Sequence, residues 1–105
     1  MSVDLEPQHL AEVRSILQRN VPELIVWAFG SRITGTAKKF SDLDLALVTY
    51  RPLPKEKIGE LRESFSDSNL PIRVDVIDLA SVSPDFKSIV EKNHIVLQNG
   101  KGNID

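Results

Sequence analysis

Cysteine is absent from this sequence, which excludes disulfide bonds and thiolate-ligated metal centres but leaves the redox compartment open. A strong positive charge is also missing, because the formal net charge is −2 and the isoelectric point is about 5.7. Without a basic field, the chain is not expected to bind a nucleic-acid duplex directly. A polymerase that extends duplexes is disfavoured for the same reason.

Long apolar runs are lacking as well. The longest one, Leu24 to Phe29, is far shorter than the roughly 20 residues that a membrane-spanning helix needs. The first six residues include two acidic ones and lack the apolar core of a signal peptide. A cytoplasmic protein without a membrane partner is therefore expected.

What remains is the composition of an ordinary globular protein. The 105 residues are 41% hydrophobic and 27% charged, which predicts one domain over residues 1–105 with a core large enough to fold alone. This length is too short for a catalytic domain and a separate acceptor-binding domain. The last residues, about 99–105, are polar and contain glycine, so they are predicted to be a frayed tail.

The most informative stretch runs from Gly30-Ser31 to Asp42-Leu43-Asp44, with ten residues between the two motifs. A Gly-Ser turn at the end of an apolar strand presents free backbone N–H groups to an anion. Asp42 and Asp44, two residues apart on a strand, point to the same face. Neighbouring carboxylates repel each other and favour a bound cation. A phosphate cradle beside a metal-binding pair is what phosphoryl or nucleotidyl transfer requires.

Hydrophobic periodicity predicts an α/β (α+β) domain with helices and strands in the order αβαβαβα. The predicted helices cover residues 7–18, 32–36, 55–67 and a last segment from Pro84 on; the predicted strands cover 24–29, 42–49 and 72–77, with a short apolar piece at 95–97. The first strand is apolar throughout and is expected inside the sheet, buried on both faces. The last helix begins at the cap residue Ser83, with Phe86, Ile89 and Val90 facing inward.

The placement of the two aspartates depends on strand directions. They lie beside the Gly-Ser turn only if the strands over 24–29 and 42–49 are antiparallel. In the third strand, alternation places Asp75 on one face with Arg73, and Asp75 joins Asp42 and Asp44 if this strand neighbours the second. Asp78 points to the opposite face and is predicted to cap a following turn.

These motifs resemble those of the nucleotidyltransferase superfamily that includes DNA polymerase β, and within it the minimal nucleotidyltransferases of bacteria and archaea. Their pattern is Gly-Ser, about ten residues, Asp-x-Asp and a third acidic residue on a later strand. The resemblance covers nearly the whole chain. It implies the nucleotidyltransferase fold, with a small mixed sheet of about three or four strands in which the first two strands are antiparallel.

The resemblance also implies roles for individual residues. Asp42 and Asp44 match the pair that coordinates two Mg²⁺ ions, and Asp75 matches the third carboxylate, which binds one metal and helps to activate the attacking hydroxyl. Gly30 and Ser31 match the turn that holds the β- and γ-phosphates. The implied reaction is in-line attack of a hydroxyl on the α-phosphate of a nucleoside triphosphate, with ATP as the substrate.

Arg32 and the aspartates each leave a plainer alternative open. Arg32 occupies a position that is often basic in the minimal members, and it is either a phosphate ligand or a solvated arginine. Asp42 and Asp44 are otherwise two solvated residues that cap a turn. Asp75 is otherwise half of a salt bridge to Arg73 or a lysine at an edge strand. The simple helix-cap role of Ser31 is compatible with phosphate binding.

A protein partner is implied as well. Members of this size resemble the antitoxin of a toxin–antitoxin pair, whose partner is a helical HEPN ribonuclease that receives AMP on a tyrosine. Two alternatives remain: an antitoxin that neutralises by binding alone, and a transferase for a small molecule such as an aminoglycoside. The second usually needs an additional acceptor-binding domain.

The remaining polar and aromatic residues have plain explanations. Lone histidines without further ligands at metal spacing are incidental, paired lysines lie in a solvated loop, and single aromatics belong to the core or to strand ends. These residues are His9, Trp27 (core or a wall of the site), Lys38, Lys39, Tyr50 (a strand-end residue rather than a target of self-modification) and His94.

Overall fold

Four strands form one mixed sheet in the order β3-β2-β1-β4, in a computed structural model that describes residues 2–100. In chain order the elements are α1 (Pro7–Asn20), β1 (Ile25–Phe29), α2 (Ser31–Thr34), β2 (Leu43–Val48), α3 (Lys55–Ser66), β3 (Val74–Asp78), the 3₁₀ turn η1 (Leu79–Ser81), α4 (Pro84–Lys92) and β4 (Ile95–Gln98). The predicted order is confirmed, and the apolar piece at 95–97 becomes a fourth strand that pairs antiparallel with β1.

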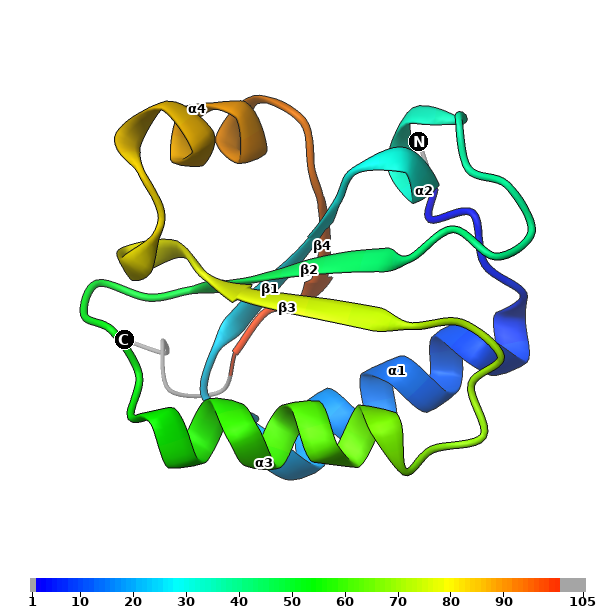
Figure 1. Cartoon of the computed structure of the whole chain (residues 1–105), viewed down its shortest axis with the longest axis horizontal. Helices are drawn as coiled ribbons and strands as arrows, with labels where there is room; N and C mark the ends of the chain where they lie inside the picture. The colour runs from blue at the N-terminus through cyan, green and yellow to red at the C-terminus, as the bar shows by residue number, and fades with distance from the viewer. Residues whose placement is uncertain (1, 101–105) are drawn as a thin grey trace.

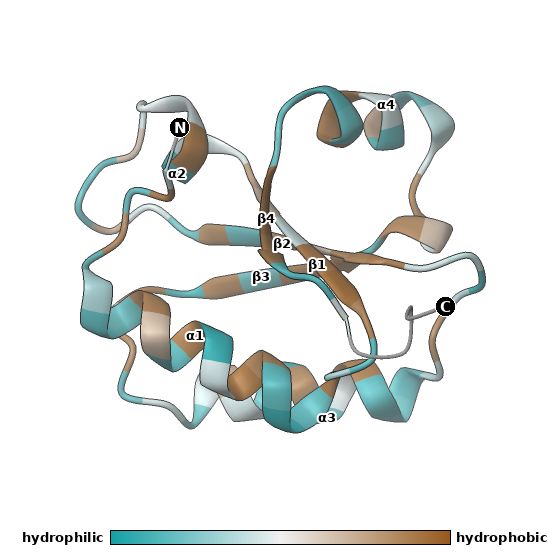
Figure 2. Cartoon of the chain, turned by 180° about the vertical axis from the view of Figure 1, so that it is seen from behind, coloured by the Kyte–Doolittle hydropathy of each residue, from teal (hydrophilic) through white to brown (hydrophobic). Residues whose placement is uncertain are grey.

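The long helices α1 and α3 lie together against one face of the sheet (Figure 1). The alternation in β2 is the reason, because Leu43, Leu45 and Leu47 all point to this face and are fully buried. Each such leucine contributes about 2 kcal/mol or more when it leaves water. Figure 2 shows that much of the length of the strands is coloured as hydrophobic. The main core therefore lies between the sheet and these two helices, and the opposite face of the sheet is not part of it.

The helices α2 and α4 stand over the opposite face, at its two ends (Figure 1). A smaller apolar cluster forms under α4, around the buried Ala46, Leu79 and Val90. The prediction that α4 turns three apolar residues inward is wrong in part, because the Phe86 side chain is 37% exposed and Ile89 is 61% exposed. The helix rests on only part of the face, so one buried row is enough to hold it.

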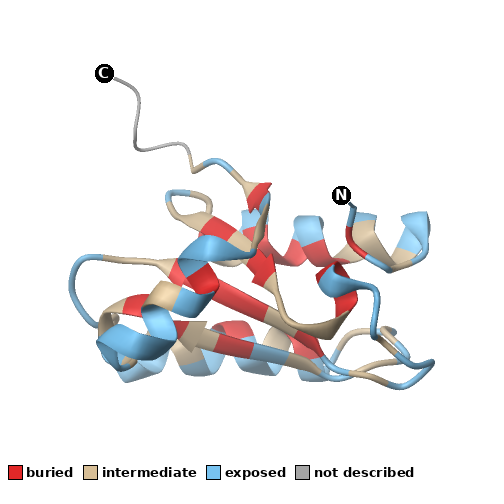
Figure 3. Ribbon diagram, turned by 90° about the horizontal axis from the view of Figure 1, so that it is seen from above, coloured by how far each residue is buried: buried red, intermediate tan, exposed pale blue. Residues whose placement is uncertain are grey.

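The strand β1 lies inside the sheet as predicted, between β2 and β4. It is not buried on both faces, however: Val26 and Ala28 are fully buried, whereas Ile25, Trp27 and Phe29 are half-buried. The half-buried side chains point to the face that α4 covers incompletely. Viewed onto this face, Figure 3 shows buried residues along the middle of the sheet and exposed ones around it.

The third strand begins at Val74, two residues later than predicted, and it lies at the edge of the sheet beside β2. Asp78 caps η1 as predicted, accepting a hydrogen bond from the Ala80 amide at 3.1 Å. It also accepts hydrogen bonds from the Thr49 hydroxyl and, at 2.7 Å, from the Leu53 amide. This buried carboxylate thus ties the end of β3 to the loop after β2.

The predicted tail falls mostly outside the described residues, which end at Gly100. Within them, Gly100 lies against the backbone of Glu23 and Leu24, and the Gln98 side chain donates to the carbonyls of Val21 and Leu24. None of the helices within residues 2–100 combines the length and apolar character that crossing a bilayer requires.

Candidate active site

The Gly30-Ser31 turn lies beside the start of β2. The strands β1 and β2 are antiparallel, as predicted, and Phe29 is opposite Asp44 in their register. Gly30 follows Phe29 with φ 84° and ψ −158° and forms the N-cap of α2. Its carbonyl accepts hydrogen bonds from the amides of Ile33 and Thr34 at 3.1 and 3.3 Å. The end of β1 and the start of β2 therefore meet at one place on the open face of the sheet.

Contact between Gly30 and Asp44 is unusually close. A Cβ atom on Gly30 would overlap the Asp44 carboxylate, with its Cγ at 3.2 Å. Only glycine leaves this space, and a φ of 84° with an extended ψ is itself a conformation almost restricted to glycine. The Gly30-Ser31 turn and the Asp44 carboxylate are therefore immediate neighbours.

Asp75 is brought next to Asp44 by the sheet. The strands β2 and β3 are parallel, and the two aspartates are direct partners in the register, so both side chains point to the same face. The alternative of a salt bridge from Asp75 to Arg73 or a lysine is not found among the residues described. The condition that placed Asp75 with the Asp-x-Asp pair is met.

Electrostatic repulsion between these carboxylates is visible at Asp44. Its pKa is raised above the ordinary value, first by burial and then by the negative charges of Asp75 and Asp42. Asp44 is half-buried, whereas Asp42, just before β2, and Asp75 are exposed. A cation would relieve both the repulsion and the desolvation.

The three carboxylates do not form a finished metal cage. Within residues 2–100, no three histidine, cysteine, aspartate or glutamate side chains are gathered closely enough to hold an ion as they stand. Three carboxylates nevertheless supply the hard oxygen ligands that Mg²⁺ prefers. Because Asp42 and Asp75 are exposed, their side chains can rotate toward Asp44, so the donor set fits a magnesium ion.

Arg32 is not part of this cluster. It is 94% buried, since only 6% of it is exposed, and its guanidinium donates to four backbone carbonyls: Asp4 at 2.8 Å, Ser41 at 3.0 Å, Lys39 at 3.1 Å and Lys38 at 3.3 Å. The structure therefore corrects both sequence alternatives, phosphate ligand and solvated arginine. Arg32 fixes the loop that leads to Asp42.

Arg32→Ala is expected to lower the free energy of unfolding by about 2–4 kcal/mol, because it removes a buried side chain and leaves four backbone carbonyls without their charged donor. Arg32→Lys keeps the charge but cannot span the same carbonyls, so it should recover less than half of the loss. Urea denaturation followed by circular dichroism measures both. The exposed Arg14→Ala serves as the control; an equal loss there would contradict the assigned role.

The other residues singled out from the sequence lie in ordinary surroundings. His94 stacks on Trp27 with ring centroids 3.8 Å apart, and its Nδ1 is 3.0 Å from the Val90 carbonyl. His9 lies 3.8 Å from Glu6. Tyr50 is 98% exposed but follows the end of β2, away from Asp44.

Sequence reasoning missed an aromatic wall of the site. Phe29 is the register partner of Asp44, and Phe86 of α4 meets its ring edge-on, with centroids 5.8 Å apart. Phe29 could have been predicted, because the antiparallel pairing expected for the first two strands places the end of the first strand opposite the start of the second. For Phe86 the sequence predicted only an inward orientation, because its contact with Phe29 depends on where α4 crosses the sheet.

Comparison with known proteins finds related sequences. The family model described as "Polymerase beta, Nucleotidyltransferase" matches residues 11–101. A probable protein adenylyltransferase, MntA of Haemophilus influenzae, is 46% identical over 103 residues, which are 98% of this chain and 90% of that protein.

Solved structures are similar as well. A chain in a crystal structure of a toxin–antitoxin complex with AMP-PNP superposes with a TM-score of 0.72 and 28% identity, covering 88% of this chain and 74% of that chain. A structure of tri-AMPylated Shewanella oneidensis HEPN toxin in complex with MNT antitoxin matches at a TM-score of 0.64 and 24% identity, covering 89% and 71% of the two chains. At 24% identity, this second match shows only that the fold is similar.

Proposed function

Because this chain belongs to the polymerase β nucleotidyltransferase family, we propose that it transfers AMP from ATP to a tyrosine hydroxyl of a HEPN-type ribonuclease toxin and thereby acts as its antitoxin. The observation that carries the proposal is the pairing of Asp44 with Asp75 across β2 and β3, in contact with the Gly30 turn. The similarity to MntA, a probable protein adenylyltransferase, supports a protein acceptor. Such a reaction belongs in the cytoplasm, where ATP and the toxin meet.

Each residue of the site has a proposed role. Asp42, Asp44 and Asp75 hold two Mg²⁺ ions, which when bound neutralise charge on the triphosphate and lower the pKa of an attacking hydroxyl. The backbone N–H groups at Gly30 and Ser31 bind the β- and γ-phosphates. Residues 1–105 constitute a single catalytic domain.

The proposed step is a displacement at the α-phosphorus. A bond forms between the acceptor oxygen and the α-phosphorus, and the bond from that phosphorus to the oxygen bridging to the β-phosphate breaks. Pyrophosphate leaves with the bonding electrons, while the hydroxyl proton passes to Asp75 or to solvent. The exposed position of Asp75 supports its contact with a hydroxyl that arrives from outside.

One observation favours a second candidate, an antitoxin that neutralises by binding alone. The carboxylates within residues 2–100 are not gathered into a ready metal site, and an antitoxin that acts by binding alone needs no such site. The exposure of Asp42 and Asp75 weighs against this reading, because exposed side chains are free to rotate toward Asp44.

Incubation with a HEPN-type protein encoded beside this chain, α-³²P-labelled ATP and Mg²⁺ is expected to place label on that protein. The reaction should stop with EDTA and in Asp42→Asn/Asp44→Asn. Label on the partner that disappears in the variant supports catalysis. A partner that stays unlabelled yet is still neutralised by the variant would support the binding-only antitoxin instead.

A further inference from the structure

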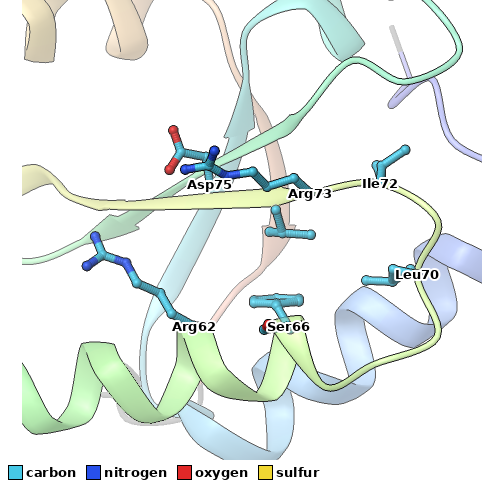
Figure 4. A pocket seen from close by; sticks show the side chains of 8 residues that line it. Arg62, Ser66, Leu70, Ile72, Arg73 and Asp75 are labelled. Atoms are coloured by element: carbon cyan, nitrogen blue, oxygen red, sulfur yellow. The ribbon is translucent and has the colours of Figure 1, made fainter.

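A groove opens at the edge of the sheet directly beside Asp75. It has a volume of about 660 Å³ and lies between α3 and β3, within the size range of ligand sites. Its lining includes the apolar residues Phe65, Leu70 and Val74. Arg62 on α3 and Arg73, just before β3, also line it (Figure 4). No residue of this groove other than Asp75 has a role in the proposed reaction.

The backbone of β3 is open toward this groove, because β3 is an edge strand. The Arg73 carbonyl accepts from the Leu43 amide at 3.0 Å, so the backbone of Arg73 faces β2 and that of the next residue, Val74, faces outward. Farther along, the Val76 carbonyl is capped by Arg62, whose Nη2 donates to it at 2.8 Å. The stretch beside Asp75 can accept an added strand, and Arg62 marks its far end.

The charge of the groove is positive next to the carboxylates. Figure 4 shows Arg62 rising from α3 toward the strand and Arg73 extending along the strand toward Asp75. Both arginines are exposed, and neither is in an ion pair among the residues described. Arg73 lies two residues before Asp75, so both side chains are on the same face, about 7 Å apart along the strand.

The expected path of the acceptor into the site also leads to this groove. Across the sheet the order is the Gly30-Ser31 turn after β1, then Asp44 on β2, then Asp75 on β3, then the groove. An in-line displacement puts the entering and leaving oxygens on opposite sides of the phosphorus. With pyrophosphate toward the turn, the acceptor enters from the side of β3.

We propose that this groove docks the acceptor segment of the partner protein, an extended segment that pairs with the edge of β3 and carries an acidic side chain two residues from the acceptor hydroxyl. With the hydroxyl at Asp75, the spacing of the added strand places that acidic side chain opposite Arg73. Arg62 attracts further negative charge at the end of the groove. This inference rests on the proposed function, because it assigns the acceptor side of the same site.

Fluorescein-labelled peptides test the docking without any need for catalysis. Two short β-prone peptides share a central tyrosine and differ only in bearing glutamate or lysine two residues to either side. Anisotropy with the full chain should show binding of the glutamate peptide. Arg62→Glu/Arg73→Glu should weaken it about tenfold or more and favour the lysine peptide. The control Arg14→Glu/Arg51→Glu has the same net charge at exposed positions outside the groove.

Equal binding of both peptides, binding of neither, or equal weakening by the control pair would overturn the docking proposal. Thermal unfolding checks that each variant folds, and Arg73→Gln alone replaces the double variant if it does not.

A kinetic readout separates the groove from the nucleotide site. With the HEPN-type partner as acceptor, Arg62→Glu/Arg73→Glu should raise the KM for the partner about tenfold while the KM for ATP changes less than about twofold. A parallel rise in the KM for ATP would mean that the arginines hold the triphosphate, which contradicts the proposal. If the wild-type chain labels no partner at all, the proposed function fails, and the peptide measurements still decide whether the groove docks an acidic segment.

Discussion

Asp44→Asn is expected to lower AMP transfer about 10³-fold or more while leaving the fold intact. A bound metal ion stabilises the transition state by several kcal/mol, and about 4 kcal/mol corresponds to a factor of about 10³ in rate. Asp44 is the half-buried member of the set, between the Gly30 turn and Asp75. Single-turnover transfer from labelled ATP measures the effect, with the exposed Asp67→Asn as the control.

The same substitution should not destabilise the protein in the absence of metal. The Asp44 pKa is raised in the folded state, first by burial and then by Asp75 and Asp42. An acid whose pKa is higher in the folded state than in the unfolded state binds its proton more tightly when folded, so its contribution to stability grows as the pH falls. In EDTA, stability should therefore rise on acidification from above the folded pKa toward the unfolded value. Asp44→Asn should remove that component.

Mg²⁺ offers an independent check. An ion that binds only the folded state raises the unfolding temperature. Wild-type chain should show this increase, Asp44→Asn should not, and Asp67→Asn should behave as the wild type. An equal increase in all three would mean that the ion binds elsewhere.

Much of the site was predictable because successive side chains along a strand point to opposite faces of the sheet. Leu43, Leu45 and Leu47 alternate with Asp42 and Asp44, and that alternation alone decides which side chains enter the core. The same rule separates Asp75 from Asp78, and the structure places these two on opposite faces, one exposed and one buried. The sequence placed Asp75 beside Asp44 only on the condition that β3 pairs with β2. Alternation within a strand does not determine which strand lies next to it.

The features that could not be predicted depend on contacts between distant segments. Arg32 is held by carbonyls of residue 4 and of the loop over 38–41, and no local pattern shows that these segments enclose it. Exposure of Ile89 reflects how far α4 reaches over the sheet. The groove beside Asp75 exists because β3 is at the edge and α3 passes next to it, which periodicity within either element does not reveal.

Gly30→Ala is expected to destabilise the protein by about 3 kcal/mol and to reduce transfer about 10²-fold or more. Its φ of 84° with ψ of −158° lies in a region that costs a residue with a Cβ about 1–3 kcal/mol. The new methyl group would also overlap the Asp44 carboxylate, and displacing a reacting group by about 1 Å can cost 10²-fold. Urea denaturation and the transfer assay measure the two effects separately.

Two other glycines separate the causes of that loss. Gly35 has the same φ of 84° but nothing within 4 Å of an added Cβ, so Gly35→Ala should cost only the backbone strain, about 1–2 kcal/mol, and leave transfer nearly unchanged. Gly59, inside α3 and also without neighbours at that distance, should gain about 0.5–1 kcal/mol on replacement by alanine. If Gly30→Ala and Gly35→Ala lose equal stability and both keep their activity, the close approach of Gly30 to Asp44 has no role in placing the carboxylate.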